Sequence, residues 1–189
     1  MKKEYVFLTV LASLFIGSKL FAKPKTPTET GGGTGGNTTG IDKNRPSGVS
    51  FAVFNKNFGN IRNAGRRYAG EITPTGNIYK KFDTWQNGAA AMIAHIQRYI
   101  KNVGFGKLNT INLIIRTYAP SSENDTTGYI AFVERKSGIN RHAVLDATNK
   151  NEIYAVCKAM SQMEDSKATE FFTRLLFDAA WVTAEKQNN

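Results

Sequence analysis

The chain has 189 residues, of which 25 are Lys or Arg and 15 are Asp or Glu, so its formal net charge is +10. A chain of this length can form one compact domain with appendages, and an apolar content of 41% argues against a wholly disordered protein. A single cysteine excludes an intramolecular disulfide framework and a multi-cysteine zinc site, and having only two histidines weakens any histidine-rich metal site.

The first 22 residues have the pattern of a secretory signal peptide. Lys2 and Lys3 give a basic start, the apolar run 6–16 is short for a membrane span, and Ala22 precedes a plausible cleavage point. An uncleaved anchor is the alternative, whereas a lipoprotein is excluded because no cysteine follows the run. We therefore expect a secreted or periplasmic protein with no stable membrane span after signal cleavage.

Residues 23–47 are predicted to be a linker that precedes a folded domain over residues 48–189. Thr, Gly, Pro and Asn dominate this stretch, and the run from Gly31 to Gly36 has no apolar side chain to bury. The run is not a phosphate-binding loop, because no Gly-Lys-Ser/Thr follows it.

The folded part begins with an apolar segment and a predicted β-hairpin. Residues 68–72 and 78–82 are short β-prone runs, and the sequence between them contains Pro74, Gly76 and Asn77, which favour a turn.

Five helices are expected after the hairpin, because apolar residues recur with helical spacing. The first runs from a cap at Asp83 to Val103, and the second carries Ile111 to Tyr118 and stops before Pro120. The third starts near Asp125 and stops at Gly138, the fourth runs from Asn149 to Glu164, and the fifth starts at about Ala168 and includes Trp181. The predicted fold class is α+β, mostly α, with five helices plus one β-hairpin. A domain of about 140 residues is large enough to bury an independent core.

One carboxylate lies where the helical spacing places apolar side chains. Cys157, Met160 and Glu164 are three and four residues apart and share one helix face. Partial burial and the negative end of the helix dipole both disfavour the anion, so the pKa of Glu164 is expected to be raised. A carboxylic acid that is protonated near neutral pH can protonate the leaving oxygen of a glycosidic bond. Periodicity alone favours a simpler interpretation, in which the helix end frays and Glu164 points into water beside Lys167.

Two other carboxylates are candidates for an assisting role. Glu123 lies just before the third helix, whose N-terminus stabilises an anion, so it suits capping or orienting better than proton donation. Glu71 lies in the predicted hairpin, where it faces either a cleft or solvent. Cys157 has little support as a nucleophile on an apolar helix face, and His95 and His142 are most simply a helix-surface and a loop residue.

The segment Asn57-Phe58-Gly59-Asn60-Ile61-Arg62 resembles the Asn-Pro-Gly-Asn-Ile-Arg opening of a family of phage virion and secreted lysozyme-like domains. Further parts of that pattern follow in order, namely Phe82 with Gly88, Thr110-Ile111, Ile114-Ile115, Tyr118-Ala119-Pro120, Glu123-Asn124-Asp125-Thr126, Tyr129-Ile130 with Val133, and a last helix that closes on Glu164. The likeness covers about residues 55–165. It has two departures, because Phe58 replaces the family's Pro and Asp165-Ser166 replaces its Asn-Gly.

A second likeness concerns the order of these parts. In bacterial glucosaminidases, a helix that ends in the catalytic Glu precedes an Asn-rich Phe-Gly-Ile-Lys turn and a hairpin. Here the similar turn, residues 58–62, and the hairpin come first, and the helix with Glu164 comes last. This order is what a circularly permuted lysozyme-like fold would give. It implies that Glu164 lies beside Asn57, Asn60 and the hairpin across one groove.

The resemblance implies a secreted peptidoglycan-cleaving glycosidase, a muramidase or a lytic transglycosylase, that needs no metal or organic cofactor. Glu164 would be the general acid, and Glu71 or Glu123 would orient water or stabilise positive charge on the sugar. The residues expected to bind the glycan are Asn57, Asn60, Arg62 and Tyr118. The positive net charge suits peptidoglycan or a related anionic glycan, and a monomer is expected.

Two other functions remain open at this point. The two departures from the family pattern motivate a non-catalytic wall-binding or structural module on the same fold. Arg62, Arg66 and Arg67 lie near Phe58 and Tyr68, a pattern also found in single-stranded nucleic-acid binding. A solvated basic loop explains these arginines equally simply and export argues against nucleic acid, so no nucleic-acid partner is expected.

Overall fold

The structure is a computed structural model that describes residues 44–102, 106 and 108–188. The expected signal peptide and most of the expected linker therefore lie outside the described residues. The described part is mostly helical, with seven helices: α1 Phe51–Phe54, α2 Trp85–Ile100, α3 Ile111–Tyr118, α4 Thr126–Ser137, α5 Lys150–Glu164, α6 Ser166–Phe171 and α7 Arg174–Asn188. Among the helices so described, none has both the length and the apolar character needed to cross a membrane.

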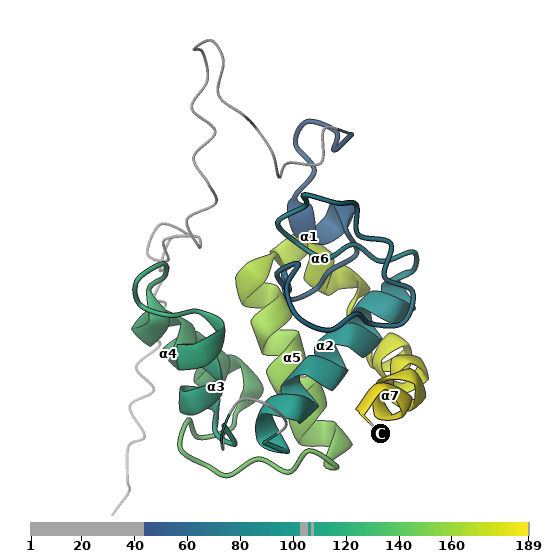
Figure 1. Cartoon of the computed structure of the whole chain (residues 1–189). Coiled ribbons are helices and arrows are strands. Elements are labelled where there is room, and N and C mark those ends of the chain that lie inside the picture. Colours follow the sequence, from purple (N-terminus) through teal and green to yellow (C-terminus); the bar gives the residue numbers. More distant parts are fainter. Residues whose placement is uncertain (1–43, 103–105, 107, 189) are drawn as a thin grey trace, which may run out of the picture.

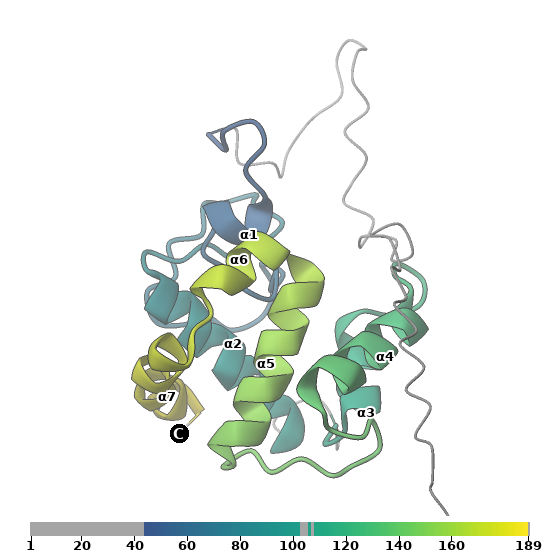
Figure 2. The same cartoon turned by 180° about the vertical axis from the view of Figure 1, so that it is seen from behind.

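Helices α2 and α5 form the centre of the molecule and pack against each other (Figure 1). Helix α7 packs on α2, whereas α3 and α4 lie on the opposite side, where α4 contacts α5. The view from behind shows the same order, with α1 and α6 together at one end of α5 (Figure 2). The end of α5 that carries Glu164 therefore meets the segment that follows α1.

Local capping explains where most helices begin and end. Thr110, Asp125 and Asn149 each accept a hydrogen bond from a backbone N–H of the next turn, so α3, α4 and α5 begin directly after them. Helix α4 ends at Gly138, whose φ of 71° is the left-handed conformation that glycine adopts without strain. The expected limits of these three helices are confirmed to within one residue.

Two helix predictions need correction. The cap of α2 is Thr84 and not Asp83, because the Thr84 hydroxyl accepts from the N–H of Asn87 at 3.1 Å. The expected fifth helix is two helices, α6 and α7, so the described part has seven helices, including the short α1, and not five. The chain turns at Phe172, whose fully buried ring contacts Phe58 and Phe177, with centroids 4.8 and 6.2 Å away. The break between α6 and α7 thus coincides with the residue whose ring enters the core.

The expected β-hairpin is not confirmed, since the described residues contain isolated antiparallel bridges and no regular strand. One bridge joins Glu71 to Phe82, as the hairpin requires, and the other joins Tyr79 to Arg62. Residues 78–82 therefore divide their pairing between two segments, 71–72 and 61–62, and neither pairing extends into a ladder.

Phe58 anchors the segment between α1 and α2. Its ring is fully buried, with its centroid 4.9 Å from that of Trp85 and 4.8 Å from that of Phe172. The Phe58 side chain thus fixes this segment to α2 and to the α6–α7 junction by apolar packing.

Candidate active site

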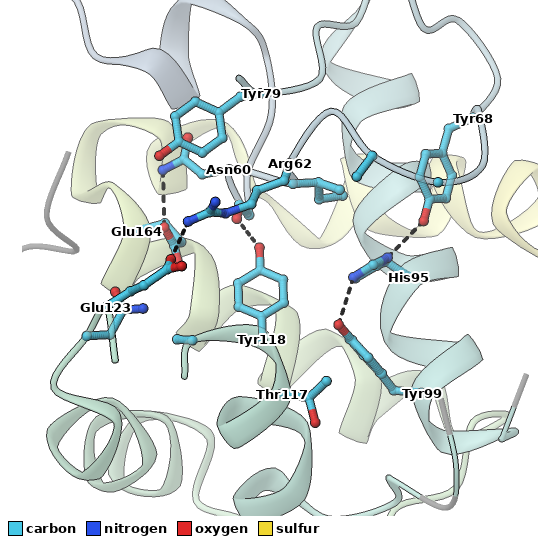
Figure 3. Close-up of a pocket in the computed structure, with 16 residues that line it drawn as sticks. Asn60, Arg62, Tyr68, Tyr79, His95, Tyr99, Thr117, Tyr118, Glu123 and Glu164 are labelled. Carbon is cyan, nitrogen blue, oxygen red and sulfur yellow. Dashed lines mark hydrogen bonds and ion pairs between the residues drawn. The ribbon is translucent and has the colours of Figure 1, made fainter. Parts of the chain in front are cut away.

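A cavity of about 330 Å³ opens where the segment after α1 meets the ends of α3 and α5. It is lined by Gly59, Asn60, Ile61, Arg62, Ala64, Gly65, Tyr68, Tyr79, His95, Tyr99, Thr117, Tyr118, Ala119, Glu123, Asn124 and Glu164. Figure 3 shows Glu164, Asn60 and Tyr79 at one end, Tyr68, His95 and Tyr99 at the other, and Arg62 and Tyr118 between them. The volume is at the lower end of what small-ligand sites require.

Glu164 is the last residue of α5, and the corner that follows it fixes its position. The backbone N–H of Asp165 donates to the carbonyl of Ser161 at 2.8 Å, which closes α5. The carboxylate of Asp165 accepts from the N–H groups of Lys167 and Ala168 at 2.7 and 3.0 Å, so the same residue begins α6. The helix end does not fray, and Glu164 is directed into the cavity (Figure 3).

Two neutral donors hold the carboxyl group of Glu164. The Tyr129 hydroxyl donates to Oε1 at 2.8 Å, and the Asn60 amide donates to Oε2 at 3.1 Å. Among the described residues no Lys, Arg or His forms an ion pair with it. Burial therefore outweighs the two hydrogen bonds and raises the pKa of Glu164 from 4.5 to about 7. This is the direction that the sequence predicted.

The Asn60 side chain can form a hydrogen bond with Glu164 in either protonation state of the carboxyl group. Its φ of 49° is a left-handed conformation that Asn tolerates better than most residues, and it turns the side chain toward α5. Its Oδ1 atom is buried without a hydrogen-bond partner in the described part of the chain. A flip of the amide would present this acceptor to the protonated carboxyl group, in place of the donor presented to the carboxylate.

Asn57 supports this segment from beneath and does not line the cavity. Its side chain is fully buried, donates to the carbonyls of Ile61 and Lys80 at 3.0 Å each, and accepts from the N–H of Ile61 at 2.9 Å. All of these partners are backbone groups, so Asn57 fixes the turn that carries Asn60. The expected contact between Asn57 and a glycan would require this network to open.

Tyr118 lines the cavity at the end of α3. Its hydroxyl donates to the carbonyl of Gly59, and a Cβ at Gly59 would lie 2.5 Å from that hydroxyl oxygen, so any larger residue there would require Tyr118 to move. Burial and the charge of Glu164 raise the pKa of Tyr118 and Tyr129 well above 10. Both hydroxyls therefore stay protonated throughout the physiological range and act as hydrogen-bond donors.

Arg62 and Glu123 form an ion pair between two separate parts of the cavity wall. Arg62 belongs to the segment after α1, whereas Glu123 lies in the turn between α3 and α4. Their side chains are 64% and 49% exposed, so the pair lies in contact with water. The structure thus brings together Glu164, Glu123, Asn60, Arg62 and Tyr118 of the expected site (Figure 3).

Glu71, in contrast, lies outside the cavity lining. Its side chain is 3% exposed and pairs with Lys80, which is 2% exposed, with both carboxylate oxygens 3.1 Å from Nζ. Thr73 and the N–H of Tyr68 also donate to it, at 3.1 and 3.0 Å. Glu71 therefore stabilises the irregular segment between α1 and α2.

His95 corrects a prediction from the sequence, because it lines the cavity and does not lie on an outer helix surface. Its Nδ1 is 2.8 Å from the Tyr68 hydroxyl and its Nε2 is 3.2 Å from the Tyr99 hydroxyl. Burial, with Arg98 and Lys80 nearby, lowers the pKa of His95 to about 4, so the imidazole is neutral at pH 7. The four-residue spacing of His95 and Tyr99 was visible in the sequence, but the contribution of Tyr68 and Tyr79 depends on the loop path.

No group of three or more His, Cys, Asp or Glu side chains that could hold a metal ion is present in the described ranges. Cys157 is fully buried, and burial raises the pKa of its thiol above the range in which a thiolate forms.

No family model matches the chain. The sequence is 31% identical over 170 residues to Protein P5 of Pseudoalteromonas phage PM2, in an alignment that covers 87% of this chain and 88% of the phage protein.

Proposed function

The chain belongs to the family of Protein P5 of phage PM2, and we propose that it is a peptidoglycan-cleaving glycosidase of the muramidase or lytic transglycosylase type. The observation that carries this proposal is Glu164, a carboxylic acid with a pKa of about 7 that faces a cavity and has no cationic partner among the described residues. Groups with such pKa values are suited to general acid catalysis near neutral pH.

The reaction requires two proton transfers that Glu164 can supply in turn. Protonated Glu164 gives its proton to the glycosidic oxygen, the C–O bond to the sugar breaks, and the leaving sugar departs as an alcohol. The resulting carboxylate then accepts a proton from the nucleophile, which is water in hydrolysis or a hydroxyl of the same sugar in transglycosylation. Tyr129 and Asn60 hold the carboxylate between these steps through the hydrogen bonds described above.

The remaining site residues take supporting roles in this proposal. Glu123 is the second carboxylate at the cavity and would stabilise positive charge on the sugar ring or orient water. Asn60, Arg62 and Tyr118 would bind the glycan, because all three line the cavity beside Glu164. Asn57 and Glu71 would act indirectly, since their polar atoms are engaged in the loop beneath it.

A lysozyme-like scaffold in circularly permuted order is part of the same proposal. Its support is the contact between Asn60, which belongs to the early Phe-Gly-Asn-Ile-Arg turn, and Glu164, which ends α5 more than a hundred residues later. The permuted order predicts that these two residues lie close together. We also propose that the protein is exported and monomeric and works without a cofactor. Removal of residues 1–22, which carry three Lys and one Glu, leaves a net charge of about +8 that attracts it to an anionic wall.

The test is cleavage of purified peptidoglycan, followed as loss of turbidity and release of reducing ends or anhydro-sugars. Glu164→Gln keeps the size of the side chain and removes the proton, so activity is expected to fall at least about a hundredfold. Glu170→Gln is the matched control, because Glu170 is an exposed residue of α6 outside the cavity lining, and it should retain wild-type activity. Equal activity of wild type and Glu164→Gln would remove Glu164 from the chemistry.

A non-catalytic wall-binding module is the second candidate. The observation that favours it is the engagement of Glu123 by Arg62, which leaves Glu164 without a free second carboxylate in this structure. Co-sedimentation with insoluble peptidoglycan without any cleavage product would support this function in place of the enzymatic one.

A further inference from the structure

The ion pair between Arg62 and Glu123 occupies a position that a ligand would have to share. Both residues line the cavity that contains Glu164, and both side chains are about half exposed or more, so a molecule entering from solvent meets them. An exposed ion pair is weak, because water and salt screen it and two flexible side chains must be held in place. A competing anion can therefore replace the Glu123 carboxylate.

The guanidinium group of Arg62 has capacity for such an anion. Within the described part of the chain its contact with Glu123 uses Nη2 alone, so Nη1 and Nε are not occupied by that carboxylate. A guanidinium group presents five N–H donors in a planar fork and matches a carboxylate with two parallel hydrogen bonds. The contact seen in the free protein is thus only part of what Arg62 can form.

The base of Arg62 is held in place before any ligand arrives. The preceding residue, Ile61, is fixed through its N–H and its carbonyl by Asn57, and Arg62 itself forms the antiparallel bridge with Tyr79. A side chain that starts from a fixed backbone loses less conformational freedom on binding. Arg62 is therefore placed as a recognition residue on a fixed wall.

We propose that Arg62 binds a carboxylate of the substrate, and that Glu123 takes the place of this carboxylate in the free protein. This inference rests on the proposed function and makes the substrate of the site an anionic glycan that carries carboxylates along its chain. Binding would exchange one carboxylate for another on Arg62, and it would release Glu123 toward the sugar beside Glu164.

The charges of the cavity wall favour a specific contact between Arg62 and a substrate carboxylate over a general attraction of the whole wall for anions. Arg62 is the only Lys or Arg among the described residues that line the cavity, whereas Glu123 and Glu164 are both acidic. His95 adds no positive charge at pH 7 because it is neutral there. A bound carboxylate can therefore be neutralised at this wall by Arg62 alone.

The experiment measures binding in the Glu164→Gln background, where no turnover confuses the result. Three tetrasaccharides serve as probes: a neutral β-1,4-linked N-acetylglucosamine oligomer, an alternating oligomer whose muramic acid units carry free lactyl carboxylates, and the same oligomer with stem peptides on those carboxyl groups. The second and third probes separate the two sources of carboxylate, namely the lactyl group and the peptide. Calorimetry gives Kd for each.

Three further substitutions are compared in that background. Arg62→Gln removes the guanidinium, Glu123→Gln removes the competing carboxylate, and Arg67→Gln removes the same charge from the same exposed loop outside the cavity lining. Arg62→Gln is expected to weaken binding of a carboxylate-bearing probe about tenfold and to change binding of the neutral oligomer by less than about twofold. Glu123→Gln should tighten the carboxylate-bearing complex, and Arg67→Gln should affect all probes equally and slightly.

The outcomes distinguish this inference from the proposed function. If glycans bind but Arg62→Gln weakens neutral and carboxylate-bearing probes equally, or no more than Arg67→Gln does, the inference is overturned and the glycosidase proposal stands. If Glu123→Gln weakens the anionic complex, Glu123 is not a competitor and the inference also fails. If no probe binds and wild type cleaves no peptidoglycan, the proposed function itself is wrong, and the inference is overturned with it.

Discussion

At the scale of single residues, the chemistry of the cavity depends on how Glu164 is solvated. Tyr129 and Asn60 replace two water molecules with hydrogen bonds from neutral groups, which favour the carboxylate but bring no positive charge. Burial disfavours the carboxylate more strongly, and the pKa of about 7 is the balance of the two. A cation placed beside Glu164 would reverse this balance and leave a permanently ionised group that cannot donate a proton.

The raised pKa of Glu164 predicts how the free energy of unfolding depends on pH. The folded state holds this proton up to about pH 7, whereas the unfolded chain releases it near 4.5, so the contribution of Glu164 is complete below pH 4.5 and is lost as the pH rises to about 7. The loss is at most about 3 kcal/mol, because the group keeps some access to water through the cavity. His95 contributes with the opposite sign, since its folded pKa of about 4 makes stability rise between pH 4 and 6.5.

The difference in the free energy of unfolding between Glu164→Gln and wild type isolates the contribution of Glu164 from that of His95. We expect the free energy of unfolding of the variant, relative to that of wild type, to increase by up to about 3 kcal/mol between pH 4.5 and 7.5. Urea denaturation at half-unit pH steps measures it. A difference that stays constant with pH would show that the pKa of Glu164 is not raised.

At the scale of elements, the segment between α1 and α2 forms one wall of the cavity without regular secondary structure. Asn57, Phe58 and the pair of Glu71 with Lys80 hold it by three means: side-chain hydrogen bonds to backbone, aromatic packing and a buried ion pair. These contacts join residues that are not adjacent in sequence, such as Asn57 with Lys80 and Phe58 with Trp85. The wall is therefore stabilised by individual side chains and not by a ladder.

This arrangement predicts that breaking the Glu71–Lys80 pair costs stability but not chemistry. Lys80→Met leaves the Glu71 carboxylate buried without its cation and should lower the free energy of unfolding by about 3 kcal/mol or more, and adding Glu71→Leu should restore most of that loss. Asp178→Asn, which breaks the exposed pair of Arg174 with Asp178, should cost less than about 1 kcal/mol. Chemical denaturation of the variants at pH 7 measures these differences.

A substitution of Glu71 itself distinguishes a structural role of this residue from a catalytic one. A Glu71→Gln variant that is less stable but keeps its peptidoglycan cleavage per folded molecule fits the structural role. Loss of cleavage with unchanged stability would return Glu71 to the catalytic group, as the sequence alone allowed.

The contrast between helices and this wall explains what the sequence could predict. Helix limits at Thr110, Asn149 and Gly138 follow from local capping, which involves residues within one turn of each other. The irregular pairing of residues 78–82 with two segments involves partners that only the folded chain selects. For the site, the position of Glu164 on an apolar helix face was visible, whereas the burial of Asn57 and the place of His95 required the path of the loop.

At the scale of the whole molecule, the last turn of α7 forms hydrogen bonds with the loop that carries Tyr68, at the end of the cavity away from Glu164. Gln187 accepts from the N–H of Ala69 at 2.7 Å through Oε1, and its carbonyl accepts from Arg66. Asn188 donates to Gln97 of α2 at 2.9 Å. The loop that carries Tyr68 is therefore held by α7 as well as by α2, and packing of α7 influences a site that it does not line.

Gln187→Ala should loosen this loop without unfolding the molecule. Removing one hydrogen bond worth about 1 kcal/mol should increase the rate of amide exchange at Ala69 about fivefold, with little change in core amides such as that of Ile153. Lys186→Ala, at an exposed neighbouring position, is the control. Exchange followed by NMR gives both rates, and equal rates at Ala69 in the two variants would show that Gln187 does not hold the loop.

The corner at Asp165 limits how the length of this polypeptide can change. Because α5 stops and α6 starts on one residue, a single amino acid inserted between Val156 and Met163 cannot be absorbed at that junction. The added residue would turn Glu164 by about 100° around the helix axis and shift it by about 1.5 Å, out of reach of Tyr129. Insertions in the connecting segments are therefore compatible with the proposed reaction. Within α5, in contrast, the number of residues must stay unchanged so that Glu164 keeps its position.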